Sequence, residues 1–217
     1  YQKRARDVIR AVAAFARARG RRLMVRLVKG AYWDGEVKKA QQAGRPDYPV
    51  FTTKAATDVS YLACSRLMLQ NADVLYCAFA THNAHTAAAI AHMADQAGVK
   101  DYEFQRLHGM GEALYAAAGL DKPVRIYAPV GSHEDLLPYL VRRLLENGAN
   151  SSFVHALLDE RVPASAVAAD PIASVEAHPD RHAKIPTPKD MYMDRQNSLG
   201  RDYSQKADRE RHAAALA

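Results

Sequence analysis

Residues 74–83 read Val74-Leu-Tyr-Cys-Ala-Phe-Ala80-Thr-His-Asn83, a run of apolar residues that ends in three polar ones. A short apolar run with aromatic and β-branched residues is typical of a strand that is covered by helices. Similar runs occur at 23–28, 102–107 and 124–128. We therefore predict four strands, with 74–80 as the second of them.

Helical patterns separate these strands. Alanine-rich stretches at 54–70, 84–97 and 110–118 predict helices, and another is predicted over 133–147. Before the first strand, apolar residues recur at helical spacing over 3–19, so an amphipathic helix is expected there. Strands that alternate with helices favour a parallel sheet with helical crossovers.

Four strands make a small sheet for a complete α/β domain, and no strand precedes the first helix. The sequence therefore indicates an α/β fold in which residues 1–155 form the C-terminal half of a (β/α)8 barrel, with the first four strands outside this chain. After about residue 159, prolines punctuate a polar stretch with few large apolar residues. We expect this stretch to be an interdomain linker.

The composition excludes several classes of protein. Only two cysteines are present, Cys64 and Cys77, which cannot form a disulfide scaffold, and no signal peptide is visible, so a reducing cytosolic compartment is expected. The net charge of the whole chain is +6. Residues 1–22 alone carry +7, with eight basic residues against Asp7, so the rest of the chain is close to neutral. Such a segment could bind nucleic acid, which is one alternative function, but a solvated outer face of a helix is the simpler interpretation.

Polar residues follow the predicted strands, where parallel α/β folds place their ligands. Arg26 lies inside an apolar strand, so its charge needs an anionic or electron-rich partner. Trp33 follows in a predicted loop, where it could stack on a planar ring. Lys29 or Lys54 could instead form a Schiff base, as in barrel aldolases, which is a second alternative.

The predicted last helix carries a second candidate site. Tyr139, Arg142, Arg143 and Glu146 share one face, and two guanidinium groups suit a small carboxylate. Solvated ion pairs along an exposed helix would give the same spacing. We expect no metal site, because His82 has no partners at ligand spacing.

Several motifs together resemble the proline dehydrogenase domain of bacterial proline utilization A. The similar strings are collinear over 1–158 and comprise Arg22–Asp34, Ala80–Asn83, Phe104–Glu112, Arg125–Gly131 and Tyr139–Asn150. The resemblance implies a distorted (β/α)8 barrel over 1–158 and a linker over 159–217 towards an aldehyde dehydrogenase domain. It also implies non-covalently bound FAD and the oxidation of L-proline to Δ1-pyrroline-5-carboxylate.

The resemblance also implies roles for residues at matching positions. Arg26 and Tyr127 would be catalytic, with Arg26 near the reactive nitrogen of the flavin. The substrate would be bound by Tyr139, Arg142, Arg143 and Glu146. The cofactor would be bound by Arg26, Val28, Lys29, Gly30, Tyr32, Trp33, Thr52, Thr53, Lys54, His82 and Asn83.

The family context adds expectations about the parent protein. The resemblance implies a bifunctional, homo-oligomeric enzyme whose second activity uses NAD to oxidise glutamate semialdehyde. Electrons would pass to a membrane quinone, so the protein would be cytoplasmic and peripherally associated with the inner membrane. Nucleic acid would be bound only by an N-terminal domain outside this chain. The 217 residues by themselves are expected to be inactive and to fold poorly, because an incomplete barrel leaves sheet edges open.

Overall fold

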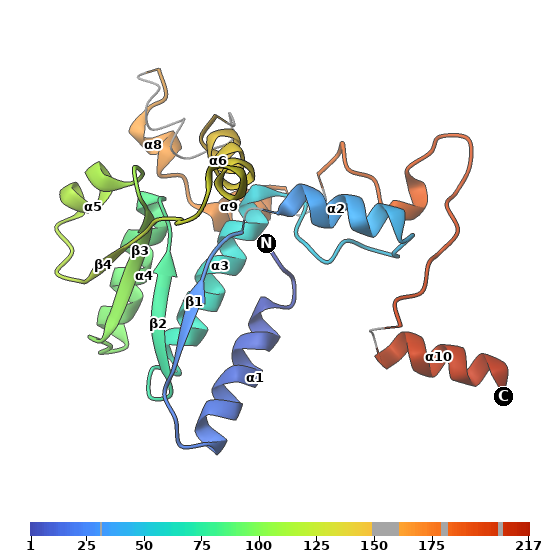
Figure 1. Ribbon diagram of the computed structural model, residues 1–217, viewed down its shortest axis with the longest axis horizontal. Helices are drawn as coiled ribbons and strands as arrows, with labels where there is room; N and C mark the ends of the chain where they lie inside the picture. The colour runs from blue at the N-terminus through green and yellow to red at the C-terminus, as the bar shows by residue number, and fades with distance from the viewer. Residues whose placement is uncertain (31, 149–160, 179–181, 204–205) are drawn as a thin grey trace.

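The structure, a computed structural model, describes all residues except 31, 149–160, 179–181 and 204–205. The described residues contain one parallel sheet with the strand order β1-β2-β3-β4 (Figure 1). Its strands are β1 (Leu23–Leu27), β2 (Leu75–Ala80), β3 (Tyr102–Leu107) and β4 (Val124–Tyr127). Sequential order with parallel pairing is what consecutive strands of a (β/α)8 barrel have, so the four predicted strands and their arrangement are confirmed.

The predicted helices are present, with ends that differ by a few residues from the prediction. They are α1 (Ala5–Ala18), α3 (Lys54–Leu69), α4 (Ala84–Gln96), α5 (Glu112–Ala118) and α6 (His133–Gly148). Among the described residues up to 148, one helix was not predicted. α2 (Trp33–Gln42) follows β1, so the expectation that Trp33 lies in a loop is wrong. Three acidic or glycine residues in its first turn, Asp34, Gly35 and Glu36, obscured its weak apolar pattern.

Side-chain caps explain where several helices begin. The Thr53 hydroxyl accepts a hydrogen bond from the Ala56 amide, and the Asn83 side chain accepts one from the Thr86 amide. Ser132 and Asp135 form a capping box, in which the Ser132 hydroxyl accepts from the Asp135 amide at 3.3 Å and donates to the Asp135 carboxylate at 2.8 Å. Helix α6 therefore begins at His133 and includes Pro138.

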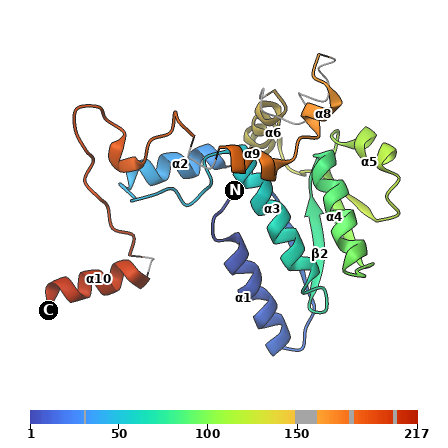
Figure 2. The ribbon, with the colours of Figure 1, turned by 180° about the vertical axis from the view of Figure 1, so that it is seen from behind.

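One face of the sheet forms the hydrophobic core with α1, α3 and α4, which lie over it in Figure 2. Every second strand residue points to this side, and Leu75, Phe79 and Phe104 are fully buried there. Phe104 packs edge-on against Tyr102 at 5.6 Å between ring centroids. This packing fixes the register of the strands and so determines which residues face the opposite side.

The opposite face of the sheet is polar. Arg26 of β1, Glu103 and Gln105 of β3 and Arg125 of β4 lie on it, in register across the strands. Between them β2 contributes Ala78, whose small side chain leaves room above it. In a closed barrel this face would be the interior.

The residues after 160 include α8 (Ala164–Val167), α9 (Pro171–Ala177), the 3-10 helix η1 (Pro188–Asp190) and α10 (Lys206–Leu216). Helix α9 packs against α3 and η1 against α2, whereas α10 lies apart from the sheet (Figure 1). The prolines thus punctuate a segment that contacts the preceding part of the chain. The division into a domain over 1–158 and a linker over 159–217 stays a prediction.

The basic segment 1–22 forms α1 and the turn after it. Four of its eight cations have carboxylate partners, through the pairs Lys3–Asp47, Arg10–Asp7, Arg17–Asp73 and Arg22–Asp101. These exposed pairs fit the interpretation of α1 as a solvated outer helix. None of the helices within the described ranges combines the length and the apolar character that crossing a membrane requires.

Candidate functional site

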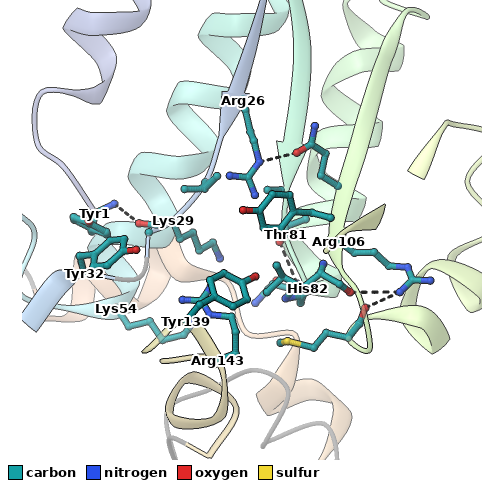
Figure 3. Close-up of a pocket in the computed structure, with 18 residues that line it drawn as sticks. Tyr1, Arg26, Lys29, Tyr32, Lys54, Thr81, His82, Arg106, Tyr139 and Arg143 are labelled. Carbon is teal, nitrogen blue, oxygen red and sulfur yellow. Dashed lines mark hydrogen bonds between the residues drawn. The ribbon is translucent and has the colours of Figure 1, made fainter. Parts of the chain in front are cut away.

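A cavity of about 420 Å³ lies at the carboxyl ends of the strands, between the sheet and α6 (Figure 3). Of its eighteen lining residues, all within the described part of the chain, five are cationic and none is a carboxylate. The predicted site residues that line it are Arg26, Val28, Lys29, Gly30, Tyr32, Lys54, His82, Asn83, Tyr127, Tyr139 and Arg143. The fold therefore brings together side chains that are spread over 118 positions of the sequence.

Arg26 lies on the polar face of β1 and points into the cavity (Figure 3). Its Nε donates to Oε1 of Gln105 at 2.6 Å, and its guanidinium carbon lies 5.5 Å from the ring centroid of Tyr127. Arg26 is exposed on the open face of the sheet, and its charge has the polar and aromatic partners that its position in an apolar strand required. The geometry leaves its two terminal nitrogens on the cavity side.

Lys29 and Lys54 share the carboxylate of Asp58. Lys54 Nζ lies 2.7 Å from Asp58 Oδ2, and Lys29 forms an ion pair with Oδ1. Burial acts to raise the pKa of Asp58, but the two ammonium groups outweigh it and lower that pKa. Burial lowers the pKa of Lys29, and Asp58 opposes this effect. The pKa of Lys29 stays below its ordinary value because burial outweighs the effect of Asp58, whose carboxylate pairs with both ammonium groups.

His82 is held in its neutral form. Burial, and then the nearby Arg106 and Arg143, lower its pKa to about 4. Its Nε2 accepts a hydrogen bond from the Leu107 amide at 3.1 Å, so Nδ1 carries the proton of the neutral ring. At neutral pH, His82 is therefore a hydrogen-bond donor through Nδ1 in a cationic cavity.

Helix α6 brings Tyr139 and Arg143 to the cavity. The guanidinium of Arg143 lies 5.2 Å from the ring centroid of Tyr139, and the Tyr139 ring lies 6.4 Å from that of Tyr127. Arg142 does not line the cavity and instead stacks on Tyr32, at 5.0 Å from its ring centroid. The side chain of Glu146 lies outside the described residues.

Three predicted cofactor-binding residues lie away from the cavity lining. Trp33 is half-buried, and its Nε1 donates to the Phe51 carbonyl at 2.7 Å. Thr52 Oγ1 accepts from the His182 amide at 3.2 Å, while Thr53 caps α3. Their hydroxyl and indole groups are thus used within the protein, and the cofactor contacts implied for them stay predictions.

The sequence interpretation assigned no role to the seven other lining residues, which include three near the end of β3. Gln105 and Arg106 stand near the end of β3, and Met110 follows in the next turn. The Arg106 guanidinium donates to the Met110 carbonyl at 3.2 Å. Two polar residues near the carboxyl end of an apolar strand were the feature that could have identified this pair.

Comparison with known proteins gives the same relationship as the motifs. The sequence model of the family described as proline dehydrogenase matches residues 1–156. The bifunctional protein PutA of Salmonella typhimurium is 52% identical over 218 residues, an alignment that covers 93% of this chain and 16% of that protein. The chain therefore spans about a sixth of the length of this curated relative.

Solved structures extend the similarity to three dimensions. A mutant of proline utilization A from Bradyrhizobium japonicum has a TM-score of 0.90 at 51% identity, covering 97% of this chain and 22% of that chain. Proline utilization A from Bdellovibrio bacteriovorus, described as inactivated by N-propargylglycine, has a TM-score of 0.82 at 34% identity, covering 100% and 22%. These likenesses confirm the α/β fold class and the resemblance found in the motifs. Because the family model matches well over half of its residues, the chain belongs to the proline dehydrogenase family.

Proposed function

We propose that this chain forms the part of an enzyme that binds FAD and L-proline and oxidises the proline to Δ1-pyrroline-5-carboxylate. Membership of the proline dehydrogenase family supports the reaction. The observation that carries the proposal is the cavity at the strand ends, with five cationic side chains and no carboxylate among its described lining residues. Such a lining attracts a polyanion and a substrate carboxylate together.

The residues present fit FAD. Lys29 and Lys54 hold positive charge beside the amino ends of α3 and α4, an arrangement suited to a pyrophosphate. Gly30 has a φ of +101°, and a Cβ there would meet the ring of Tyr1, so this turn requires glycine. When bound, FAD would supply the acceptor for the two electrons that leave the substrate.

Arg143 and Tyr139 would bind proline. A guanidinium holds a carboxylate by paired hydrogen bonds, and the Tyr139 ring can pack on the pyrrolidine ring. Oxidation removes a hydride from the ring carbon beside nitrogen and a proton from the nitrogen, and a C=N bond results. Arg26 would hold positive charge on the opposite wall, where negative charge develops as the acceptor is reduced.

The wider context is also proposed. The name of the Salmonella relative, a bifunctional protein, supports a parent with a second activity, which would be the NAD-dependent oxidation of glutamate semialdehyde. A membrane quinone would accept the electrons, and the parent would be a cytoplasmic homo-oligomer associated peripherally with the inner membrane. These proposals are supported by the resemblance of the motifs.

An anaerobic visible spectrum of the purified parent protein tests the function. We expect a flavin band that bleaches when L-proline is added, and a large loss of bleaching rate in Arg143→Met at limiting proline. Arg21→Met is a matched control, because this exposed arginine lies at the opposite end of β1. A protein that stays colourless when FAD is supplied would contradict the proposal.

A further inference from the structure

A chain of four polar side chains crosses the sheet beneath the cavity. Arg125 donates to both oxygens of Glu103 at 2.7 Å, Gln105 Nε2 donates to Glu103 Oε1 at 2.6 Å, and Arg26 Nε donates to Gln105 Oε1 at 2.6 Å. The chain runs from β4 through β3 to β1. We call these four residues the strand relay.

The two central members are enclosed. Glu103 is 2% exposed and Gln105 is 6% exposed, so their polar atoms depend on partners within the sheet, which include the Tyr76 hydroxyl that donates to Glu103 Oε2 at 3.3 Å. A buried carboxylate that lost its partners would be costly, and a fully satisfied network holds its members in one arrangement. The relay is therefore rigid where it supports Arg26.

The relay reaches across a whole strand. Arg26 on β1 and Gln105 on β3 are separated by β2, a span of about 10 Å between strand axes. They meet because β2 places Ala78 between them, in register with both Arg26 and Glu103. Ala78 is fully buried, as expected of a small residue that is covered by these longer side chains.

The charges at the two ends set the direction of the Gln105 amide. The Glu103 carboxylate can only accept, so Gln105 must turn its NH2 group towards it. Its carbonyl oxygen then faces Arg26, whose guanidinium can only donate. Because this bond uses Nε, the two terminal nitrogens of Arg26 are aimed past Tyr127 into the cavity.

We propose that Gln105, oriented by the Glu103–Arg125 pair, is the positioning residue that holds the Arg26 guanidinium against the isoalloxazine of bound FAD. This inference rests on the proposed function. It assigns to Gln105 a role in the reduction potential of the flavin, because a fixed positive charge stabilises the reduced, anionic form more than a mobile one does.

The midpoint potential of the flavin bound to the purified parent protein tests the assignment. We expect Gln105→Leu to weaken binding of reduced relative to oxidised FAD about tenfold, which makes the two-electron potential about 30 mV more negative. Arg26→Met should shift the potential in the same direction and further. Adding Gln105→Leu to Arg26→Met should then change nothing more, because the two residues act through one group.

Two further variants complete the test. Glu103→Gln keeps the side-chain volume but lets the Gln105 amide reverse, so we expect a smaller shift of the midpoint potential in the same direction. If Gln105→Leu does not fold, Glu103→Gln takes its place in the test. Gln41→Leu is the matched control, since it removes a glutamine hydrogen bond to Tyr48 far from Arg26, and it should leave the potential unchanged.

The results that would contradict this inference differ from those that would contradict the proposed function. A normal flavin band whose potential is unmoved by Gln105→Leu and Glu103→Gln would overturn the relay and leave the proposed function standing. A Gln105→Leu shift that persists in full in the Arg26→Met background would also overturn it. A wild-type protein that binds no FAD would overturn the proposed function and this inference with it.

Discussion

Asp58 holds two lysines of the cavity with one carboxylate, and its side chain is 12% exposed. Replacing Asp58 with asparagine keeps the shape of the side chain but removes the counter-charge of the Lys29 ammonium. The side chain of Lys29 is only 25% exposed, so water compensates little for this loss. We expect Asp58→Asn to lower the free energy of unfolding by about 1–3 kcal/mol. In a thermal melt this would appear as a fall of roughly 3–10 °C in Tm.

Asp73→Asn provides the matched control. Asp73 pairs with Arg17 at 2.8 Å, but both side chains are more than half exposed. Water screens such a pair, so its loss should leave the Tm nearly unchanged. Equal effects of the two substitutions would show that the Asp58 carboxylate is not a buried counter-charge.

The low pKa of His82 predicts that the stability of the fold depends on pH. Its pKa falls from an ordinary value of 6.5 to about 4 on folding, so between these values the unfolded chain binds more protons than the folded one. Stability should therefore decrease as the pH falls from about 6.5 towards 4. The full loss in the free energy of unfolding is about 2–3 kcal/mol, and it is reached below the folded-state pKa of His82.

His82→Gln separates this effect from other titrations. The amide oxygen of glutamine can accept from the Leu107 amide as Nε2 does, but the side chain does not titrate. We expect denaturant unfolding curves of the variant to lose less stability than the wild type between pH 6.5 and 4. Parallel pH profiles for the two proteins would contradict the low pKa.

At the residue scale, sequence patterns identified single chemical groups better than their partners. Arg26 was recognised because a charge within an apolar strand demands a partner. Its partner Gln105 stands 79 positions away, and only the parallel register of β1, β2 and β3 brings the two together. Arg142 and Arg143 share a helix face, yet Arg142 stacks on Tyr32, a contact that helical periodicity could not predict.

Helix α6 is weakly secured by packing against the sheet. Leu137, Leu140 and Val141 are 49%, 45% and 44% exposed, whereas Ala87, Ile90 and Ala94 of α4 are at most 2% exposed. Elements with few buried contacts open locally at low free energy. We expect backbone amides of α6 to exchange with solvent at least about tenfold faster than those of α4, as measured by hydrogen exchange.

The capping box of α6 gives this prediction a graded test. Ser132→Ala removes the acceptor for the Asp135 amide, and a lost cap costs about 1 kcal/mol, so exchange in the first turns should accelerate about fivefold. Ser132→Asn retains an acceptor and should leave the rates near those of the wild type. Exchange in α6 as slow as in α4 would contradict the proposed weakness.

At the element scale, long periodic segments were predictable and short polar ones were not. The strands and α1, α3 and α4 have apolar faces that fill one core, so their patterns are strong. Helix α2 has only Val37 and Ala40 buried, and it packs in a separate small cluster with Tyr48 and Val50. A helix held mainly by such distant contacts leaves little periodicity in its own sequence.

At the scale of the whole molecule, residues 182–202 contact α2 and the loop that follows it, residues 43–48. The Tyr48 hydroxyl donates to the Pro186 carbonyl at 2.7 Å, the Gly200 amide donates to the Gly44 carbonyl at 2.7 Å, and Arg45 pairs with Asp202 at 3.1 Å. Polar, proline-rich composition predicted a linker here, because composition does not show which backbone groups find partners. The described part of this segment is docked on α2.

Gly200 tests whether this contact holds the segment in place. A Cβ at this position would lie 1.7 Å from the Ala43 carbonyl oxygen, so Gly200→Ala must displace one backbone from the other. Gly35→Ala, within the preceding helix α2, is the control, because a Cβ there meets nothing within 4 Å. We expect trypsin to cut after Arg195 about tenfold faster in Gly200→Ala, because release of the segment costs little once the contact is lost. Equal cleavage rates in the two variants would mean that 182–202 is not held by the Gly44–Gly200 contact and behaves as the linker that its composition predicted.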